Sequence, residues 1–224
     1  NDKYLFTFTG RSDGASQLAE GKKWAFFPSG AFAWRLGDEN FVKDLNVFSD
    51  LKLRVSFGQV GNSVVSPYQT SATLAGTNYN FGQNAGIGLA PGNLPNQELG
   101  WERSEELNLG LNVGFFNNRV TAAIEVYNRT TKDLIMRQAL PTTSGFGSII
   151  ANVGRVSNKG VEMLLNTTNI TTKNLMWTTS LNFTKNVNRL EELPNGAKYG
   201  WSGGTNPENA LAVGYPLKSF LYFQ

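Results

Sequence analysis

The sequence contains no cysteine and no histidine among its 224 residues. Disulfides, Cys/His zinc sites and Ser-His or Cys-His catalytic pairs are therefore excluded within this chain. Charged residues make up only 17% of the chain, and the net charge is +3. Because Lys and Arg are spread mostly singly, there is no basic stripe to neutralise phosphates, and we expect no nucleic-acid partner. We also predict no cofactor and no bound metal.

Long hydrophobic runs are absent as well. The longest apolar stretches, such as residues 149–151 and 163–165, are far below the ~18 residues that a membrane helix needs. A helical span is therefore excluded. Strands of a membrane barrel alternate between lipid and interior, so their hydropathy signal is weak and this possibility stays open.

The sequence is rich in β-forming patterns of period two. Residues 51–58, 104–115, 120–127 and 177–184 each alternate between apolar and polar side chains, which is typical of a strand with one apolar face. In the second segment, Leu107, Leu109 and Leu111 share one face, whereas Asn108, Gly110 and Asn112 share the other. The first residues already read as a strand and residues 219–224 stop within one, so we interpret the chain as a piece of a larger barrel domain.

The connections between these strands are alternately short and long. Residues 116–119 and 170–174 form short turns, because Asn tolerates left-handed backbone angles. Residues 37–49 form a medium link with a brief helix near 39–43. Strands that run up and down place short links at one end and long links at the other, as in outer-membrane barrels. The long links are residues 11–23, 61–100, 131–148 and 189–214.

Two folds remain compatible with alternation alone, a membrane β-barrel and a soluble carbohydrate-binding β-sandwich. The polar faces are rich in Gly, Asn, Ser and Thr but poor in Lys and Glu, unlike a solvated sheet surface. Aromatic residues gather near strand ends, as in an interfacial girdle. These features favour an all-β, antiparallel transmembrane barrel, with a small structural barrel or adhesin as a further alternative. The aromatic residues in question are Trp24, Phe26, Phe27, Trp34, Phe115, Phe116 and Trp177.

Several segments match, in the same order, those of one known family. They include Tyr4-Leu-Phe-Thr-Phe-Thr-Gly-Arg-Ser-Asp-Gly-Ala-Ser16, Lys23-Trp-Ala-Phe-Phe-Pro-Ser29, Leu51-Lys-Leu-Arg-Val-Ser-Phe-Gly-Gln-Val-Gly-Asn62, Asn96-Gln-Glu-Leu-Gly-Trp-Glu102, Tyr127-Asn-Arg-Thr-Thr-Lys-Asp-Leu134, Asn152-Val-Gly-Arg-Val-Ser-Asn-Lys-Gly-Val-Glu162 and Gly214-Tyr-Pro-Leu-Lys-Ser-Phe-Leu-Tyr222. Gln97 stands where that family commonly has Pro, and Ala15 stands where a Ser is common. Neither departure weakens the resemblance, which covers nearly the whole chain. Taken together, the segments resemble the barrel of SusC/RagA-type TonB-dependent transporters.

This resemblance implies a large plugged barrel, of the 22-stranded kind, in a bacterial outer membrane of the Bacteroidota type. Residues 1–224 would supply about eight to ten of its strands. The plug, the TonB-contacting segment and the final strands would lie outside this sequence. The implied partners are a SusD-like surface lipoprotein, TonB and outer-membrane lipid, and the implied cargo is an oligosaccharide or a peptide.

Candidate site residues are few. Adjacent acids such as Glu105 and Glu106 point to opposite faces of a strand and cannot flank one substrate bond, so we predict no catalytic residue and no enzyme. Aromatic rings of the long links stack on sugars and pack on peptide side chains, which makes them the candidate contacts for cargo or for a lid protein. They are Tyr68, Tyr79, Phe81, Trp101, Phe146, Tyr199 and Trp201.

Overall fold

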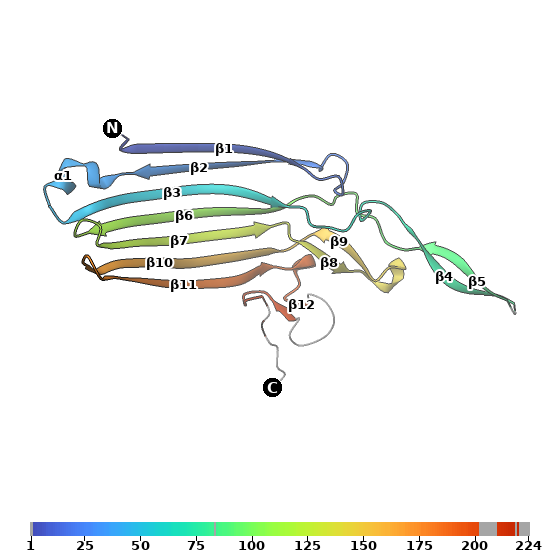
Figure 1. Ribbon diagram of the computed structural model, residues 1–224. Coiled ribbons are helices and arrows are strands. Elements are labelled where there is room, and N and C mark those ends of the chain that lie inside the picture. Colours follow the sequence, from blue (N-terminus) through green and yellow to red (C-terminus); the bar gives the residue numbers. More distant parts are fainter. Residues whose placement is uncertain (1, 83, 202–209, 218, 220–224) are drawn as a thin grey trace.

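Seven strands of the chain form one antiparallel sheet, in the order β1-β2-β3-β6-β7-β10-β11 (Figure 1). The computed structural model describes residues 2–82, 84–201, 210–217 and 219, without the side chains of Phe81 and Trp201. We call this sheet the wall sheet. Its strands are β1 (Tyr4–Gly14), β2 (Trp24–Trp34), β3 (Phe48–Asn62), β6 (Glu102–Phe115), β7 (Val120–Lys132), β10 (Arg155–Thr171) and β11 (Met176–Glu192).

Six shorter strands pair as three separate two-stranded sheets. They lie within the long connections, together with two of the 3-10 turns. The pairs are β4 (Leu74–Phe81) with β5 (Asn84–Pro91), β8 (Ile135–Ala139) with β9 (Ser148–Asn152), and β12 (Tyr199–Trp201) with β13 (Ala210–Ala212). The remaining elements are η1 (Leu36–Asp38), α1 (Asn40–Lys43), η2 (Thr142–Ser144) and η3 (Pro194–Gly196).

The predicted alternation of short and long connections is confirmed. Strands β6 and β7 are joined by residues 116–119, in which Phe116, Asn117 and Asn118 all have positive φ angles of 53–61°. Residues 172–175 join β10 to β11, and the predicted brief helix is α1, which joins β2 to β3. These three links lie at one end of the wall sheet, the short-turn end. The long links lie at the other, the long-loop end (Figure 1).

The register of the wall sheet separates its side chains into one apolar and one polar face. Cross-strand partners line up in rows that run across all seven strands. Successive residues of a strand alternate between the two faces. Rows on the apolar face are Tyr4, Trp34, Leu53, Leu111, Ile124, Met163 and Phe183, and then Phe6, Phe32, Val55, Leu109, Val126, Val161 and Lys185. Rows on the polar face are Leu5, Ala33, Arg54, Gly110, Glu125, Glu162 and Thr184, and then Thr7, Ala31, Ser56, Asn108, Tyr127, Gly160 and Asn186.

The apolar face is not covered by a second sheet in the described part of the chain. Leu107 is 53% exposed, Leu109 49% and Phe57 44%. A soluble sandwich would bury such a face against a facing sheet at ~10 Å. Continuous apolar rows that stay open to the surroundings are instead the pattern of a barrel wall in lipid.

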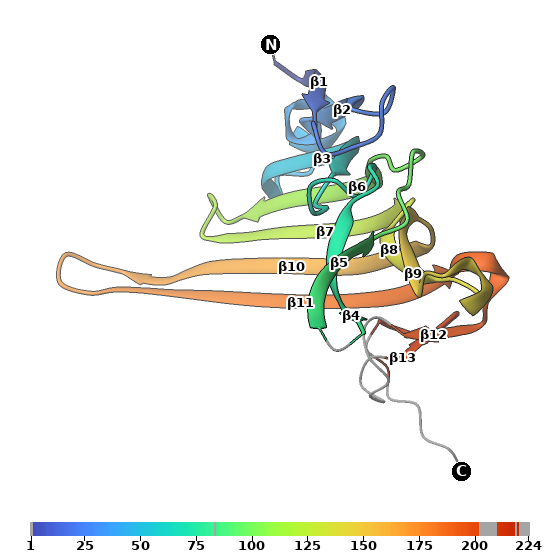
Figure 2. The same cartoon turned by 90° about the vertical axis from the view of Figure 1, so that its right-hand side faces the viewer.

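The strand direction changes across the wall sheet. Figure 2 is turned by 90° and shows β10 and β11 along most of their length, whereas β1 is foreshortened. This change is the accumulated twist that all β-sheets show and that a barrel requires. Among the residues that the structure describes, the sheet is open between β1 and β11.

Two aspects of the sequence interpretation need adjustment. The described residues place seven strands in the wall and six in the small hairpins, where eight to ten strands were expected. The hairpins β4–β5 and β8–β9 lie in segments that we interpreted as irregular loops. Gly and Asn residues hide the alternation in β4 and β5, and β8 and β9 are only five residues long each. The strand expected at residues 219–224 lies outside the described residues, except for Ser219.

None of the described helices is long and apolar enough to cross a membrane.

Candidate functional site at the long-loop end

The long-loop end of the wall sheet is held together by two small apolar clusters. One joins Val156 and Leu190 of the wall to Leu193 and Leu211 of the last long link. The other joins Ala15 and Leu18 of the β1–β2 link to Leu99, which is fully buried. The long links are therefore packed on one another and on the wall, and they can hold a site in a fixed geometry.

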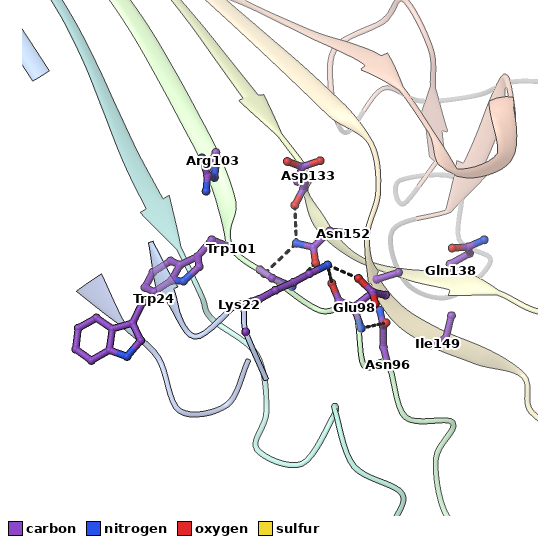
Figure 3. Close-up of a pocket in the computed structure, with 13 residues that line it drawn as sticks. Lys22, Trp24, Asn96, Glu98, Trp101, Arg103, Asp133, Gln138, Ile149 and Asn152 are labelled. Atoms are coloured by element: carbon purple, nitrogen blue, oxygen red, sulfur yellow. Dashed lines mark hydrogen bonds and ion pairs between the residues drawn. The ribbon is translucent and has the colours of Figure 1, made fainter. Parts of the chain in front are cut away.

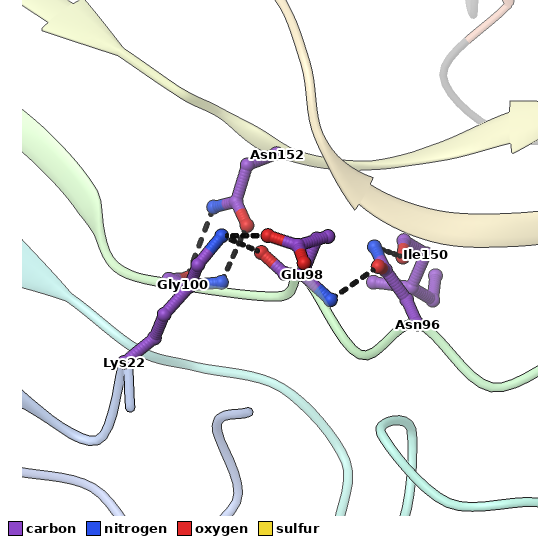
Figure 4. A network of polar contacts seen from close by, with 6 residues as sticks. All are labelled: Lys22, Asn96, Glu98, Gly100, Ile150 and Asn152. Atoms are coloured by element: carbon purple, nitrogen blue, oxygen red, sulfur yellow. Dashed lines mark hydrogen bonds and ion pairs between the residues drawn. The ribbon is translucent and has the colours of Figure 1, made fainter. Parts of the chain in front are cut away.

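A network of polar contacts fixes the segment that leads into β6 (Figure 4). The Asn152 side chain at the end of β9 accepts a hydrogen bond from the Gly100 backbone N–H (2.6 Å) and donates one to the Gly100 carbonyl (3.0 Å). Asn96 donates its amide to the Ile150 carbonyl (2.8 Å). These contacts connect the segment 96–101 to the β8–β9 hairpin over about fifty positions of sequence.

Lys22 connects the same segment to the β1–β2 link. Its ammonium donates to the Glu98 carbonyl (2.9 Å) and to the Glu98 carboxylate (2.5 Å). The hydrogen bond and the charge of Lys22 lower the pKa of the Glu98 carboxyl below its ordinary value. The Glu98 carboxylate is therefore ionised at neutral pH.

A pocket of about 710 Å³ lies beside this network, between the β1–β2 link, residues 96–103 and the β8–β9 hairpin (Figure 3). Its lining combines two indole rings with amides and charged groups, which is the composition that binds sugars and peptides. The side chains that line it include Lys22, Trp24, Glu98, Trp101, Arg103 and Asn152. Trp101 is the one predicted site residue among those that line this pocket.

Trp101 also has a packing role. Its ring meets Phe27 edge-on at 5.5 Å between centroids, and its indole N–H donates to the Lys23 carbonyl (3.3 Å). Phe27 is 3% exposed and lies over Gly61 of β3, where a Cβ atom would overlap the ring. Trp101 therefore presents only part of its surface to the pocket.

The other predicted aromatics are scattered over the long links. Tyr68 lines a second pocket of about 700 Å³, which shares Glu98 with the first. Tyr79 is 58% exposed on β4 and Tyr199 is 66% exposed on β12. Phe146 is partly exposed after η2. The side chains of Phe81 and Trp201 lie outside the described residues.

Sequence reasoning missed Lys22, Asn96, Glu98 and Asn152, which organise the pocket. Polar residues in a Gly- and Asn-rich link carry no periodic signal, so nothing in the composition marks them. Asn96 and Asn152 do each begin a segment of the family resemblance. That was the available signal.

The polar face of the wall sheet carries ion pairs that join β3 to β7, across β6, and β6 to β7. Arg54 on β3 donates to the Glu125 carboxylate (2.6 Å), and Arg129 pairs with Glu106. Asn108 adds a hydrogen bond to Glu125 (3.3 Å). Glu105 lies on the opposite face and pairs with Lys132 (2.7 Å), so the adjacent acids point apart as predicted. Among the described residues, no group of three metal-ligating side chains comes together.

The hairpin β4–β5 projects away from the wall sheet beyond the other links (Figure 1). Its register places Leu74 opposite Pro91, Gly76 opposite Leu89 and Asn78 opposite Ile87, so the apolar residues share one face of the hairpin. These side chains are open to the surroundings: Leu74 is 68% exposed, Leu89 71% and Ile87 81%. We call this surface the hairpin ridge. Exposed apolar patches of this kind mark interaction sites.

The wall sheet and the packed links at its long-loop end define the class of the protein as an outer-membrane β-barrel. Comparison with known proteins agrees: residues 1–220 match the family described as "TonB dependent receptor-like, beta-barrel". The chain belongs to this family. Membership implies a location in the outer membrane of a Gram-negative bacterium.

Individual relatives support the same assignment. The chain is 42% identical, over 87% of its length, to the protein named TonB-dependent receptor P3 of Formosa agariphila. It is 35% identical, over its whole length, to the TonB-dependent receptor SusC of Bacteroides thetaiotaomicron. Its fold matches the structure described as the RagAB peptide transporter, with a TM-score of 0.86 over 98% of this chain and 31% identity. The resemblance to SusC/RagA transporters is thus confirmed. The chain spans 19–24% of the length of these relatives.

Proposed function

We propose that the parent protein is a TonB-dependent importer of oligosaccharides or peptides, in which this chain forms part of the wall and of the outer vestibule. The wall sheet supplies an apolar face for lipid and a polar face for the interior. The relatives named SusC and RagAB support an importer, and RagAB is described as a peptide transporter. The chain itself performs no catalysis in this proposal.

The observation that carries the proposal is the arrangement of the long-loop end. A polar and aromatic pocket lies between rigidly connected links, and the hairpin ridge projects beyond them. The pocket suits a neutral, hydrogen-bonding oligomer, and the ridge suits a protein partner. We assign the ridge to a SusD-like surface lipoprotein that closes the vestibule as a lid. Energy from the inner membrane would reach the importer through TonB, which contacts a part of the parent outside residues 1–224.

The partnership is tested on the full-length parent, purified from outer membranes in mild detergent. We expect a surface lipoprotein to co-purify with the wild type. Leu74→Ser, Ile87→Ser and Leu89→Ser together should reduce its recovery at least about tenfold, because clustered apolar side chains dominate interface energies. The matched control changes the opposite face of the same hairpin, with Ala75→Ser, Thr77→Ala and Ala90→Ser, and should leave recovery unchanged.

Transport is tested separately with labelled oligosaccharide and peptide mixtures in cells. Uptake should require the parent protein and TonB and should stop when the proton gradient is dissipated. Recovery without any lipoprotein, together with uptake of a ferric siderophore or cobalamin, would place the parent in a different transporter class. A barrel that binds host surfaces and imports nothing would support the adhesin alternative.

A further inference from the structure

The apolar face of the wall sheet contains a groove across β6, β7, β10 and β11, at the rows of Leu107 and Leu109. The groove has a volume of about 540 Å³. Its floor is formed by branched aliphatic side chains, and two lysines lie within it, Lys159 on β10 and Lys185 on β11. The apolar residues are Leu107, Leu109, Val126, Val161 and Val187.

The two lysines lie on neighbouring strands in a diagonal arrangement. Lys159 is opposite Val187 and Lys185 is opposite Val161, so the two lysines are diagonal neighbours separated by roughly 7–8 Å. Each lysine therefore has an aliphatic neighbour directly across and a like charge on the diagonal. Two ammonium groups at this separation repel each other, and the repulsion grows beside an apolar surface where the effective dielectric constant is low.

Neither lysine has an ion pair or hydrogen bond within the described part of the chain. Their neighbours on the same face differ in this respect. Lys132 is paired with Glu105 at 2.7 Å and Arg155 with Glu192 at 2.6 Å. These two paired bases lie nearer the strand ends. Lys159 and Lys185 thus differ from Lys132 and Arg155 in two ways: they lack an acidic partner among the described residues, and they lie among apolar side chains.

The height of the groove on the wall fits the boundary between lipid headgroups and acyl chains. Lys159 lies four positions after Arg155, the first residue of β10, or ~13 Å along the strand. The next row of this face toward the short-turn end holds Val126, Val161 and Lys185, and the row after it, Ile124, Met163 and Phe183, is entirely apolar. A lysine at this position extends its ammonium toward the headgroup layer and keeps its methylenes in the apolar layer.

We propose that this groove binds one phosphorylated, acylated glycolipid of the outer leaflet, with an acyl chain on the aliphatic floor and a phosphate between Lys159 and Lys185. A phosphate between the two ammonium groups supplies the anionic partner that both lack, and its negative charge offsets their mutual repulsion. The assignment to the outer leaflet rests on the proposed function, because it requires the long-loop end to face outward.

The test uses the full-length parent in lipid nanodiscs. Titration with lipid A and native mass spectrometry would measure binding to the wild type, to Lys159→Gln/Lys185→Gln and to the control Lys43→Gln/Lys173→Gln. The control removes the same charge from exposed positions at the short-turn end. We expect the groove variant to lose affinity about tenfold or more, and the control to bind like the wild type. The variant Lys159→Arg/Lys185→Arg should retain binding.

Three outcomes would overturn the proposal. They are equal binding by the groove variant and the wild type, equal loss in the control, or equal binding of phosphatidylglycerol, an anionic phospholipid, at the same residues. Heat-modifiable migration in gels shows that each variant is folded. Uptake and lipoprotein recovery are measured on the same preparations. Loss of those activities with intact lipid A binding would refute the importer but not the lipid site.

Discussion

The aromatic ring of Tyr127 on β7 lies across β10 directly over Gly160. A Cβ atom at position 160 would overlap the ring. Beyond Gly160 the Tyr127 hydroxyl donates to the Asn186 side chain on β11 (3.3 Å), so one side chain spans three neighbouring strands on the polar face. The ring takes the place of the side chain that glycine lacks and compensates for the weak packing of a glycine within a strand.

Gly160→Val should therefore destabilise the barrel. The valine displaces the Tyr127 ring and breaks its bond to Asn186, at a cost of about 1–3 kcal/mol for overpacking. Gly147→Ala is the matched control, because nothing lies within 4 Å of its added Cβ. Thermal unfolding of the parent protein in detergent would measure both variants. Equal melting temperatures for the two would show that the ring does not constrain position 160.

The assignment of faces predicts opposite results at two adjacent residues of β6. Leu109 belongs to an apolar row and Asn108 to a polar row, where its amide contacts Glu125. Leu109→Arg puts a charge on the lipid face, where the cost rises with depth to ~2–4 kcal/mol at the midplane, whereas Asn108→Arg should cost far less in a wet interior. The fraction of folded, heat-modifiable protein in outer membranes reports the difference. Indistinguishable yields for the two variants would invalidate the assignment.

Much of this fold is predictable because apolar and polar residues alternate along a strand that has one apolar and one polar face. In residues 104–115 the residue types alone identify both faces of the strand, and the asparagines at 116–119 identify the turn that follows. The hairpin β4–β5 is different. On β4, Gly76 and Asn78 lie opposite Leu89 and Ile87 of β5, so β4 alone lacks an apolar face, and that face is complete only when the two strands pair.

The pocket at the long-loop end could not be assembled from the sequence for a related reason. Lys22, Glu98 and Asn152 come from three long links, and only the folded links bring them together. Of the predicted aromatics, Trp101 and Tyr68 line adjacent pockets. The contribution of all seven to cargo or lid binding stays a prediction. The position of a ring in a long link indicates that it is exposed, but the sequence contains no information on the distances between such rings.

The ion pair between Arg54 and Glu125 on the polar face should couple β3 to β7. Arg54 contacts Glu125 at 2.6 Å and Asn112 at 3.0 Å, while its Nε atom is buried without a hydrogen-bond partner in the described structure. The pair is partly exposed, so we expect a coupling energy of about 1 kcal/mol. A double-mutant cycle with Arg54→Met and Glu125→Gln measures it by unfolding in urea. A coupling energy of zero would show that these charges contribute to stability independently.

Acid should weaken the short-turn end through Glu39. Hydrogen bonds from Lys3, Trp34 and Tyr4 lower the pKa of the Glu39 carboxyl. A carboxyl whose pKa is lower in the folded protein contributes stability above its unfolded pKa, and this contribution is lost as the pH falls through the folded pKa.

The comparison is between the wild type and Glu39→Gln, with unfolding free energy measured from neutral pH down to about pH 3. The wild type should be more stable at neutral pH, and the difference should shrink as Glu39 becomes protonated. Glu20→Gln removes a carboxylate that has no ion pair or hydrogen bond among the described residues, and it should not reproduce this trend. A difference that is constant with pH would refute the role of Glu39.

The amide of Asn152 should determine the rigidity of the pocket. It exchanges two hydrogen bonds with the Gly100 backbone and donates a third to the Asp133 carbonyl (3.0 Å). Asn152→Ala removes all three and leaves the Gly100 N–H without its partner, so residues 96–101 should open more often. At about 1 kcal/mol per lost hydrogen bond, amide exchange in this segment should accelerate roughly tenfold or more, while exchange in the middle of β6 stays unchanged. Asn174→Ala, in the turn at the opposite end, is the control. Unaltered exchange at residues 96–101 in Asn152→Ala would show that the apolar cluster around Leu99 alone holds the segment in place.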